Sequence, residues 1–337
     1  MKVFVVAALS AILPILLTSA VAAPTDPWVS WANQTVGSHP LNGKIWSKEK
    51  AGFVTSDELA DAVGQADMLL LGEYHDNADH HRLQAWLLQA FAKARASAGK
   101  PKPPVVFEMI RQEQAQTLRD YLAKPTASAE DLGAVIEWEK AGWPDWSIYL
   151  PIATAAFQEG LKIVPGDASR DMLHDASRQN LKPLSPDVKQ RMALENPLEE
   201  PLQKALLDEL FRGHCEMVAP ALLAPMVDVQ RYRDATLARN MIDAAVDAKA
   251  GSAVLIAGNG HVRKDRGVPV YLAKQSPSAL KTITVMMAET QAGENDPAAF
   301  IAKNPDGEAA TDFVWFTPGF QRPDPCLEFK RQMGRKP

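Results

Sequence analysis

The chain has 337 residues, of which 46% are apolar and 23% are charged. These fractions are typical of globular proteins, so the composition excludes disordered, collagen-like and disulfide-scaffold classes. The formal net charge is −5, because 41 acidic residues outnumber 36 lysines and arginines. A mildly acidic chain lacks the basic surface that nucleic-acid binding requires, so we expect no nucleic-acid partner.

The first 23 residues are typical of an export signal. Lys2 is followed by an apolar stretch over 3–21, and small residues precede Pro24. This pattern predicts a cleaved secretory signal peptide over 1–23. The alternative is a membrane anchor, because about 20 apolar residues can span a bilayer, but Pro14 and the alanine-rich exit favour cleavage. No cysteine follows the stretch, so we expect an exported, soluble protein in the periplasm or outside the cell, without a lipid anchor or a transmembrane span.

Turn-forming residues dominate the segment 24–50, which predicts an irregular or hairpin-forming lead-in. Over 51–330, short apolar runs alternate with amphipathic stretches. Such alternation is typical of an α/β domain whose sheet is covered on both faces. In chain order we expect a helix over 57–66, a strand over 68–71, a helix over 83–98, a strand over 104–107, a helix over 113–122, and strands over 161–164, 253–257, 268–273, 283–288 and 313–316.

The segment 169–249 is longer than an ordinary connection between parallel strands, which needs only about a dozen residues. Its pattern is mostly helical and is interrupted by several prolines, so it predicts an inserted helical subdomain of several helices. We therefore expect a three-layer α/β/α fold with a mostly parallel sheet and this helical insert.

Polar side chains gather at the carboxyl ends of the predicted strands, where open α/β sheets bind their ligands. Two of these ends share the spacing Gly-x-x-His, which places His75 after the first buried strand and His261 after the fourth. Either motif alone could be a helix cap or a turn, but the two together with a carboxylate predict a shared site. The other polar residues at or just beyond the strand ends are Glu73, Tyr74, Glu108, Arg111, Asp167, Arg170 and Arg263.

The paired histidines suit two kinds of chemistry. His75, Glu108 and His261 form a ligand set for a divalent ion such as Zn or Mn. That ion would lower the pKa of its bound water, a second glutamate such as Glu73 would act as general base, and an arginine would stabilise the developing oxyanion. In a metal-free variant, His75 itself would be the base that activates water.

Two more histidines follow the first motif. We expect Asn77 or Asp79 to cap the next helix and His80 and His81 to be exposed on its first turn. The alternative is that these two histidines are ligands of an open metal or porphyrin site.

The helical insert carries His214 and Cys215 in sequence. His214 is a weaker candidate for an axial ligand of haem iron. Cys215 and Cys326 are the two cysteines of the chain, and in an exported protein they either form one disulfide or stay as buried thiols. The aromatic cluster over 138–149 is expected to pack in the core, with a ligand-binding wall as the alternative.

Several of these motifs recur in the same order in one known family. The chain resembles the ChaN-like haem-binding uptake proteins, which are similar to a wider superfamily of erythromycin esterases, TraB and Tiki proteins. The resemblance extends over roughly residues 45–330 and implies an α/β/α fold with helical additions, in an envelope-located protein that binds haem during iron uptake. The motifs are the run 69–77, the strand ending in Glu108, Gly-Trp-Pro-Asp-Trp over 142–146, His214-Cys215, the run 258–263 and the run 322–326.

The resemblance also implies site residues and partners. The family binds haem through a tyrosine, and Tyr74 inside the first motif is the first candidate, beside His75 and His214. The partners are then haem or another small molecule, and a homodimer is a further expectation. The wider superfamily implies instead a hydrolase, which is metal-dependent in its Tiki-like members. Its residues, carried over by motif, are Glu73, His75, Glu108 and His261, with Arg111 or Arg263 as the cationic partner.

Overall fold

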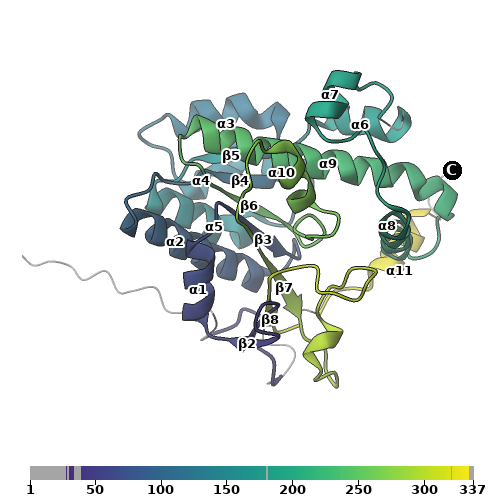
Figure 1. Ribbon diagram of the computed structural model, residues 1–337, viewed down its shortest axis with the longest axis horizontal. Helices are drawn as coiled ribbons and strands as arrows, with labels where there is room; N and C mark the ends of the chain where they lie inside the picture. The colour runs from purple at the N-terminus through teal and green to yellow at the C-terminus, as the bar shows by residue number, and fades with distance from the viewer. Residues whose placement is uncertain (1–27, 29, 34–38, 180, 320, 334–337) are drawn as a thin grey trace, which may run out of the picture.

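A central sheet organises the part of the chain that the computed structural model describes, namely residues 28, 30–33, 39–179, 181–319 and 321–333. The expected signal peptide over 1–23 lies outside these residues. Across the sheet, the strand order is β2-β1-β8-β7-β3-β6-β4-β5 (Figure 1). In chain order the strands are β1 (Ile45–Ser47), β2 (Gly52–Val54), β3 (Met68–Glu73), β4 (Val105–Arg111), β5 (Ile163–Asp167), β6 (Ala253–Gly258), β7 (Thr282–Glu289) and β8 (Phe313–Thr317).

The sheet is mostly parallel, as the sequence predicts. β3 pairs in parallel with β6 and β7, β4 pairs in parallel with β5 and β6, and β7 pairs in parallel with β8. β1 and β2 form an antiparallel hairpin that joins the sheet beside β8. Every residue of β3 and β6 is buried, which explains why both strands are apolar runs almost to their carboxyl ends.

Helices cover both faces of the sheet. On one face, Leu69 and Leu71 of β3 pack in a core cluster with the first five helices, while Met68 and Leu70 point to a second cluster on the other face. This alternation gives the predicted three layers. The helices of the first cluster are α1 (Ser56–Gly64), α2 (Ala78–Ser97), α3 (Ala115–Leu122), α4 (Ala129–Val135) and α5 (Trp146–Glu159), and those of the second are α6 (Arg170–Gln179), α9 (Pro220–Asp247) and α10 (Val268–Gln275).

The segment 169–249 is helical, with α7 (Pro186–Arg191) and α8 (Glu200–Gly213) between α6 and α9. The long helix α9 places Leu237, Ala238 and Met241 in the second core cluster, so it belongs to the helical layer of the sheet. α7 and α8 lie to the side of the sheet (Figure 1). Among the described residues, no helix combines the length and the apolar character that crossing a membrane requires.

Two local predictions differ from the structure. The segment 268–273, predicted as a strand, forms α10, whose first turn contains Pro269 and whose Tyr271 and Leu272 are buried. A short apolar run rich in branched and aromatic residues suits a strand or a buried helix, and packing against α9 decides here. In addition, α2 begins at Ala78, ahead of the amphipathic stretch predicted over 83–98, because the Asn77 side chain accepts hydrogen bonds from the first backbone N–H groups, which confirms Asn77 as one of the two predicted caps.

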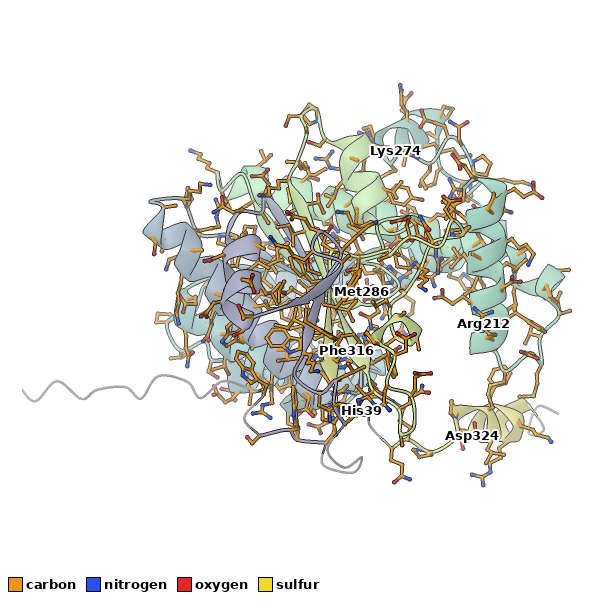
Figure 2. All side chains as sticks on the ribbon, turned by 60° about the horizontal axis from the view of Figure 1, so that its bottom comes forward. His39, Arg212, Lys274, Met286, Phe316 and Asp324 are labelled. Atoms are coloured by element: carbon orange, nitrogen blue, oxygen red, sulfur yellow. A yellow bond between two sulfur atoms is a disulfide. The ribbon has the colours of Figure 1, made fainter. Side chains whose placement is uncertain are left out.

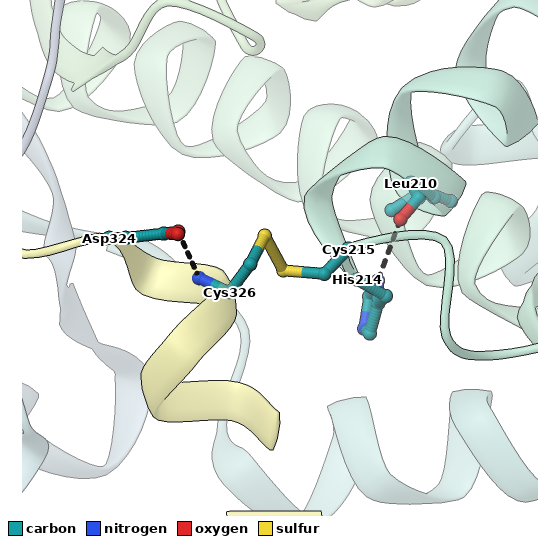
Figure 3. The surroundings of a disulfide bond; sticks show 5 residues. All are labelled: Leu210, His214, Cys215, Asp324 and Cys326. Carbon is teal, nitrogen blue, oxygen red and sulfur yellow. Dashed lines mark hydrogen bonds between the residues drawn. A yellow bond between two sulfur atoms is a disulfide. The ribbon is translucent and has the colours of Figure 1, made fainter. Parts of the chain in front are cut away.

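Cys215 and Cys326 form a disulfide, so the first of the two alternatives for these residues is confirmed. The bond joins the turn after α8 to α11 (Pro325–Met333), whose first turn is capped by Asp324 (Figure 3). In Figure 2, α8 with Arg212 and the start of α11 with Asp324 lie together at one end of the molecule. The disulfide therefore fixes the C-terminal helix against the helical insert.

Candidate functional site

A cleft of about 470 Å³ lies at the carboxyl ends of β3, β4 and β6. Glu209 from α8 and Gln230 and Arg233 from α9 contribute to its lining, so the helical insert forms part of the wall. The predicted site residues that line it are Glu73, Tyr74, His75, Glu108, His261 and Arg263. The structure thus brings the polar ends of three separate strands into one cleft.

The two glycines of the Gly-x-x-His motifs allow this close approach. Glu73 and Gly258 are register partners on the adjacent parallel strands β3 and β6, so both motifs start side by side. A Cβ atom on Gly258 would lie 3.2 Å from the ring of His75, and one on Gly72 would lie 2.5 Å from the Asn259 side chain. Any larger residue would therefore displace the histidine loop or its neighbour.

His75 is held between two carboxylates. Its Nδ1 donates to Glu73 Oε1 at 2.5 Å, and its Nε2 lies 3.9 Å from Glu108 Oε1. The ring also packs edge-on against Trp143, with 4.9 Å between the ring centres. Burial opposes a positive charge on the ring, but the carboxylates of Glu73 and Glu108 outweigh it and raise the pKa of His75 to about 8.

His261 has a corresponding arrangement on the other side of Glu108. Its Nδ1 donates to Asp234 Oδ1 at 2.6 Å, and its Nε2 lies 3.3 Å from Glu108 Oε1. Burial again opposes the charge, but Glu108 and Asp234 raise the pKa of His261 to about 10. The imidazole of His261 is therefore positively charged at neutral pH.

Glu108 is the common partner of the charged groups. Its Oε1 accepts from Arg233 Nη2 at 2.6 Å, and its Oε2 accepts the backbone N–H of Gly258 at 2.7 Å. Burial alone would raise the pKa of Glu108, but the cations of His261 and Arg233 hold it well below its usual value. Arg233 Nε also donates to Asp167 Oδ2 at 2.8 Å, which ties the end of β5 to the same network.

The sequence did not identify Arg233 and Asp234 as site residues. Both lie on α9, in the middle of the helical insert and far from any recognisable motif. The sequence does contain one signal for Asp234, which lies on the same helix face as the core residues Ala238 and Met241. A charged residue on the buried face of an amphipathic helix needs a charged or hydrogen-bonding partner.

A family model described as haem-binding uptake, Tiki superfamily, ChaN matches residues 59–272. The chain belongs to this ChaN family. The match includes His75, Glu108 and His261 and ends before Cys326. The solved structure titled "Cofacial heme binding to ChaN of Campylobacter jejuni" is 21% identical, with a TM-score of 0.61 over 80% of this chain and 95% of that chain. At this identity, the likeness supports the ChaN fold.

Two further solved structures align more weakly. A mutant of the erythromycin esterase EreC in its open conformation is 12% identical, with a TM-score of 0.40 over 84% of this chain and 99% of that chain. The type III effector HopBA1 is 14% identical, with a TM-score of 0.39 over 78% of this chain and 92% of that chain. No curated protein matches the sequence significantly. The assignment to the ChaN family therefore rests on the family model.

In this ChaN-family chain, Tyr74 lies at the cleft with 48% of its surface exposed. The prediction that His80 and His81 are exposed is wrong, because both are fully buried below the Tyr74 loop. His80 Nδ1 accepts the backbone N–H of Tyr74 at 3.0 Å, and His81 Nε2 lies 3.1 Å from the carbonyl oxygen of His75. Burial lowers the pKa of His80 well below its usual value, which keeps it a neutral acceptor.

Three other predicted residues make no contact with the network of His75, His261 and Arg233 around Glu108. His214 is next to the disulfide, where its Nδ1 donates to the carbonyl of Leu210 at 2.7 Å, and it does not line the ChaN-family cleft (Figure 3). Arg263 lines the cleft, but its guanidinium is bound to Asp265 and to a backbone carbonyl. Arg111 lines a separate cavity, and the arginine that contacts Glu108 is Arg233 instead.

The aromatic cluster packs in the core, as predicted, and none of its members is among the residues that line the cleft. Trp138 is buried in the first core cluster, and its Nε1 donates to the carbonyl of Pro144. Trp143 is partly exposed, packs against the ring of His75 and donates to the carbonyl of Met109. The cluster is therefore a packing unit, one member of which contacts a residue of the cleft.

The proposed metal ligands His75, Glu108 and His261 converge, but their surroundings do not fit a divalent ion. Both oxygens of Glu108 already accept hydrogen bonds, from Arg233 and from Gly258. An ion bound there would lie beside a buried guanidinium and a charged imidazole, which oppose a third positive charge. In the described part of the chain, no group of three His, Cys, Asp or Glu side chains has the geometry of a metal site.

Proposed function

We propose that the protein binds haem at the mouth of this cleft and takes part in haem or iron uptake. Membership in a family described as haem-binding uptake supports the ligand class. The observation that carries the proposal for this chain is the position of Tyr74, which is half-exposed at the cleft beside His75. A tyrosine oxygen is an established protein ligand of haem iron.

The surroundings of Tyr74 fit this role. The Arg322 guanidinium lies 5.7 Å from the centre of the Tyr74 ring, where its charge would stabilise an electron-rich phenolate if Tyr74 held the iron. Arg322 is itself fixed by Asp76, with 2.6 Å between nitrogen and oxygen, and by Glu289. Burial and the Glu289 charge raise the pKa of Tyr74, whereas the nearby Arg322 charge lowers it, so Arg322 is the group that would favour a phenolate at this position.

The disulfide supports the proposed location in the cell envelope. Disulfides persist in the periplasm and outside the cell and are rare in reducing compartments. Cys215 and Cys326 form such a bond, and the sequence predicts an export signal over 1–23. Both features agree with a haem-binding protein that acts outside the cytoplasm.

A haemin titration tests haem binding. Purified protein should shift and saturate the Soret band of haemin, and Tyr74→Phe should weaken this binding at least about tenfold because the iron loses its oxygen ligand. Tyr121→Phe is the matched control, because Tyr121 hydrogen-bonds to Ser128 and does not line the cleft. His214→Ala should also leave the spectrum unchanged. An unshifted band, or an unaltered titration with Tyr74→Phe, contradicts the proposal.

The pair of oriented histidines favours a second candidate function, metal-free hydrolysis. Each imidazole has its Nδ1 on a buried carboxylate, which orients the ring as in general-base sites. Neutral His75 would take a proton from water while the water oxygen attacks an ester carbonyl. The C–O bond would then break as His75 returns the proton to the leaving alcohol. The charges of His261 and Arg233 favour the negative oxygen that develops in between.

An ester such as p-nitrophenyl acetate tests this activity. Hydrolysis should increase as the pH rises through about 8, because His75 must lose its proton to act as a base. His75→Ala should abolish the reaction, whereas His174→Ala, on the exposed surface of α6, should not. EDTA should have no effect. Full activity of His75→Ala, or loss of activity in EDTA, would rule out this mechanism.

A further inference from the structure

A second cavity, of about 450 Å³, lies at the carboxyl ends of β4 and β5. Three of its lining residues are basic, namely Arg111 at the end of β4, Lys140, and Arg170 at the start of α6. Both arginines lie at or just beyond strand ends, as the sequence predicts, but neither lines the histidine cleft. The acidic residues of the same lining are Glu113, Glu137 and Asp171.

The contacts in this cavity leave the two arginines without acidic partners. Lys140 is paired with Glu137 at 2.6 Å, and Glu113 accepts the backbone N–H of Arg170. Among the described residues, no ion pair joins Arg111 or Arg170 to any carboxylate, Asp171 included. The Nε atom of Arg111 is buried and has no hydrogen-bond partner. A buried guanidinium donor without an acceptor is costly, so this arrangement favours an anionic ligand.

The cavity is close to the histidine cleft. Arg111 is the register partner of Asp167, and Asp167 contacts Arg233, which contacts Glu108. The register between β4 and β5 shifts between Phe107 and Arg111, which is typical of a β-bulge at a strand end. Tyr74 follows β3 and Arg111 ends β4, and only β6 lies between these two strands, so the strand axes are about 10 Å apart at the usual strand spacing.

We propose that Arg111 and Arg170 bind a carboxylate of the ligand that occupies the cleft. This inference rests on the proposed haem function and specifies the class of ligand, a porphyrin with free acid side chains. Tyr74, after β3, would then hold the iron, and Arg111, at the end of β4, would hold a propionate together with Arg170. Arginine suits this role because its planar guanidinium binds a carboxylate through two parallel hydrogen bonds.

Titrations with haemin and with haemin dimethyl ester test the inference. The ester keeps the iron and the macrocycle but lacks both carboxylates. The unmodified protein should bind haemin at least about tenfold more tightly than the ester. Arg111→Gln and Arg170→Gln should each weaken haemin binding and leave ester binding unchanged. Arg119→Gln is the control, because Arg119 is exposed, bonds to Gln116 and lines neither cavity.

The outcomes separate this inference from the proposed function. Equal binding of both porphyrins, or an equal loss for both in the two variants, overturns the carboxylate site and leaves haem binding intact. If neither porphyrin binds, haem binding itself is refuted and the carboxylate site with it. Because Arg170 is exposed, Arg170→Gln remains informative even if Arg111→Gln does not fold.

Discussion

His75 and His261 owe their charge to three buried carboxylates, those of Glu73, Glu108 and Asp234. The pKa of His75 is raised to about 8 and that of His261 to about 10, against about 6.5 for an unfolded histidine. A group whose folded pKa is raised stabilises the native state fully below its unfolded pKa and loses that contribution as the pH rises through the folded pKa.

We therefore expect the free energy of unfolding to fall between pH 6.5 and about 10. His75→Gln should reduce the part of this decline that lies between 6.5 and 8 and leave the later part in place. Urea denaturation at a series of pH values measures both parts, with His174→Gln on α6 as the control. A stability that rises over this pH range would show that the carboxylates do not charge the histidines.

At the scale of elements, the start of α2 supports the Tyr74 loop. The Asn77 side chain accepts from the backbone N–H groups of Asp79 and His80, and its amide donates to Glu289 at 2.7 Å. Asn77 is fully buried, so water cannot readily replace the hydrogen bonds that its partners lose when the side chain is removed.

Asn77→Ala should destabilise the protein by about 1–2 kcal/mol, at the upper end of the range for helix caps. Ser128→Ala, which removes the exposed cap of α4, is the matched comparison and should cost about 0.5–1 kcal/mol. Chemical denaturation measures both values. If the two costs are equal, the buried contacts of Asn77 add nothing to its capping role.

Elements were predictable where the sequence pattern and the packing agree. β3 and β6 are apolar runs that end at glycine and polar residues, which is the pattern typical of parallel strands buried on both faces. The run that forms α10 is equally apolar, but its state depends on contacts with α9, which no local pattern encodes. For the same reason, local sequence does not reveal that the first turn of α2 is buried below the β3 loop.

The residues of the site also divide into those that the local sequence pattern reveals and those that depend on tertiary packing. Glu73, His75, Glu108 and His261 were predictable because they follow strand ends, and the topology of a parallel sheet gathers strand ends at one edge. Arg233 enters the same site from a helix that lies more than a hundred residues from Glu108 in sequence. Its placement depends on how α9 crosses the sheet, which is a property of the tertiary fold.

At the scale of the whole molecule, the disulfide links the C-terminal helix to the insert. Closing a loop of 111 residues should stabilise the protein by about 4–5 kcal/mol in the chain-entropy model. Cys326→Ser should lower the free energy of unfolding by an amount of this order, measured in oxidising buffer. Adding a dithiol should lower the stability of the unmodified protein to that of the variant, and a variant as stable as the oxidised protein would contradict the expectation.

The same bond changes the connectivity of the cleft. It closes a covalent ring over residues 215–326, which contains Arg233, Asp234 and His261, whereas His75 and Glu108 lie on the linear part of the chain. The exposed stretch 291–296 lies inside this ring. One proteolytic cut there leaves both fragments joined through sulfur, so the C-terminal fragment, which carries the Arg322 guanidinium that contacts the Tyr74 ring, stays attached to the rest of the protein.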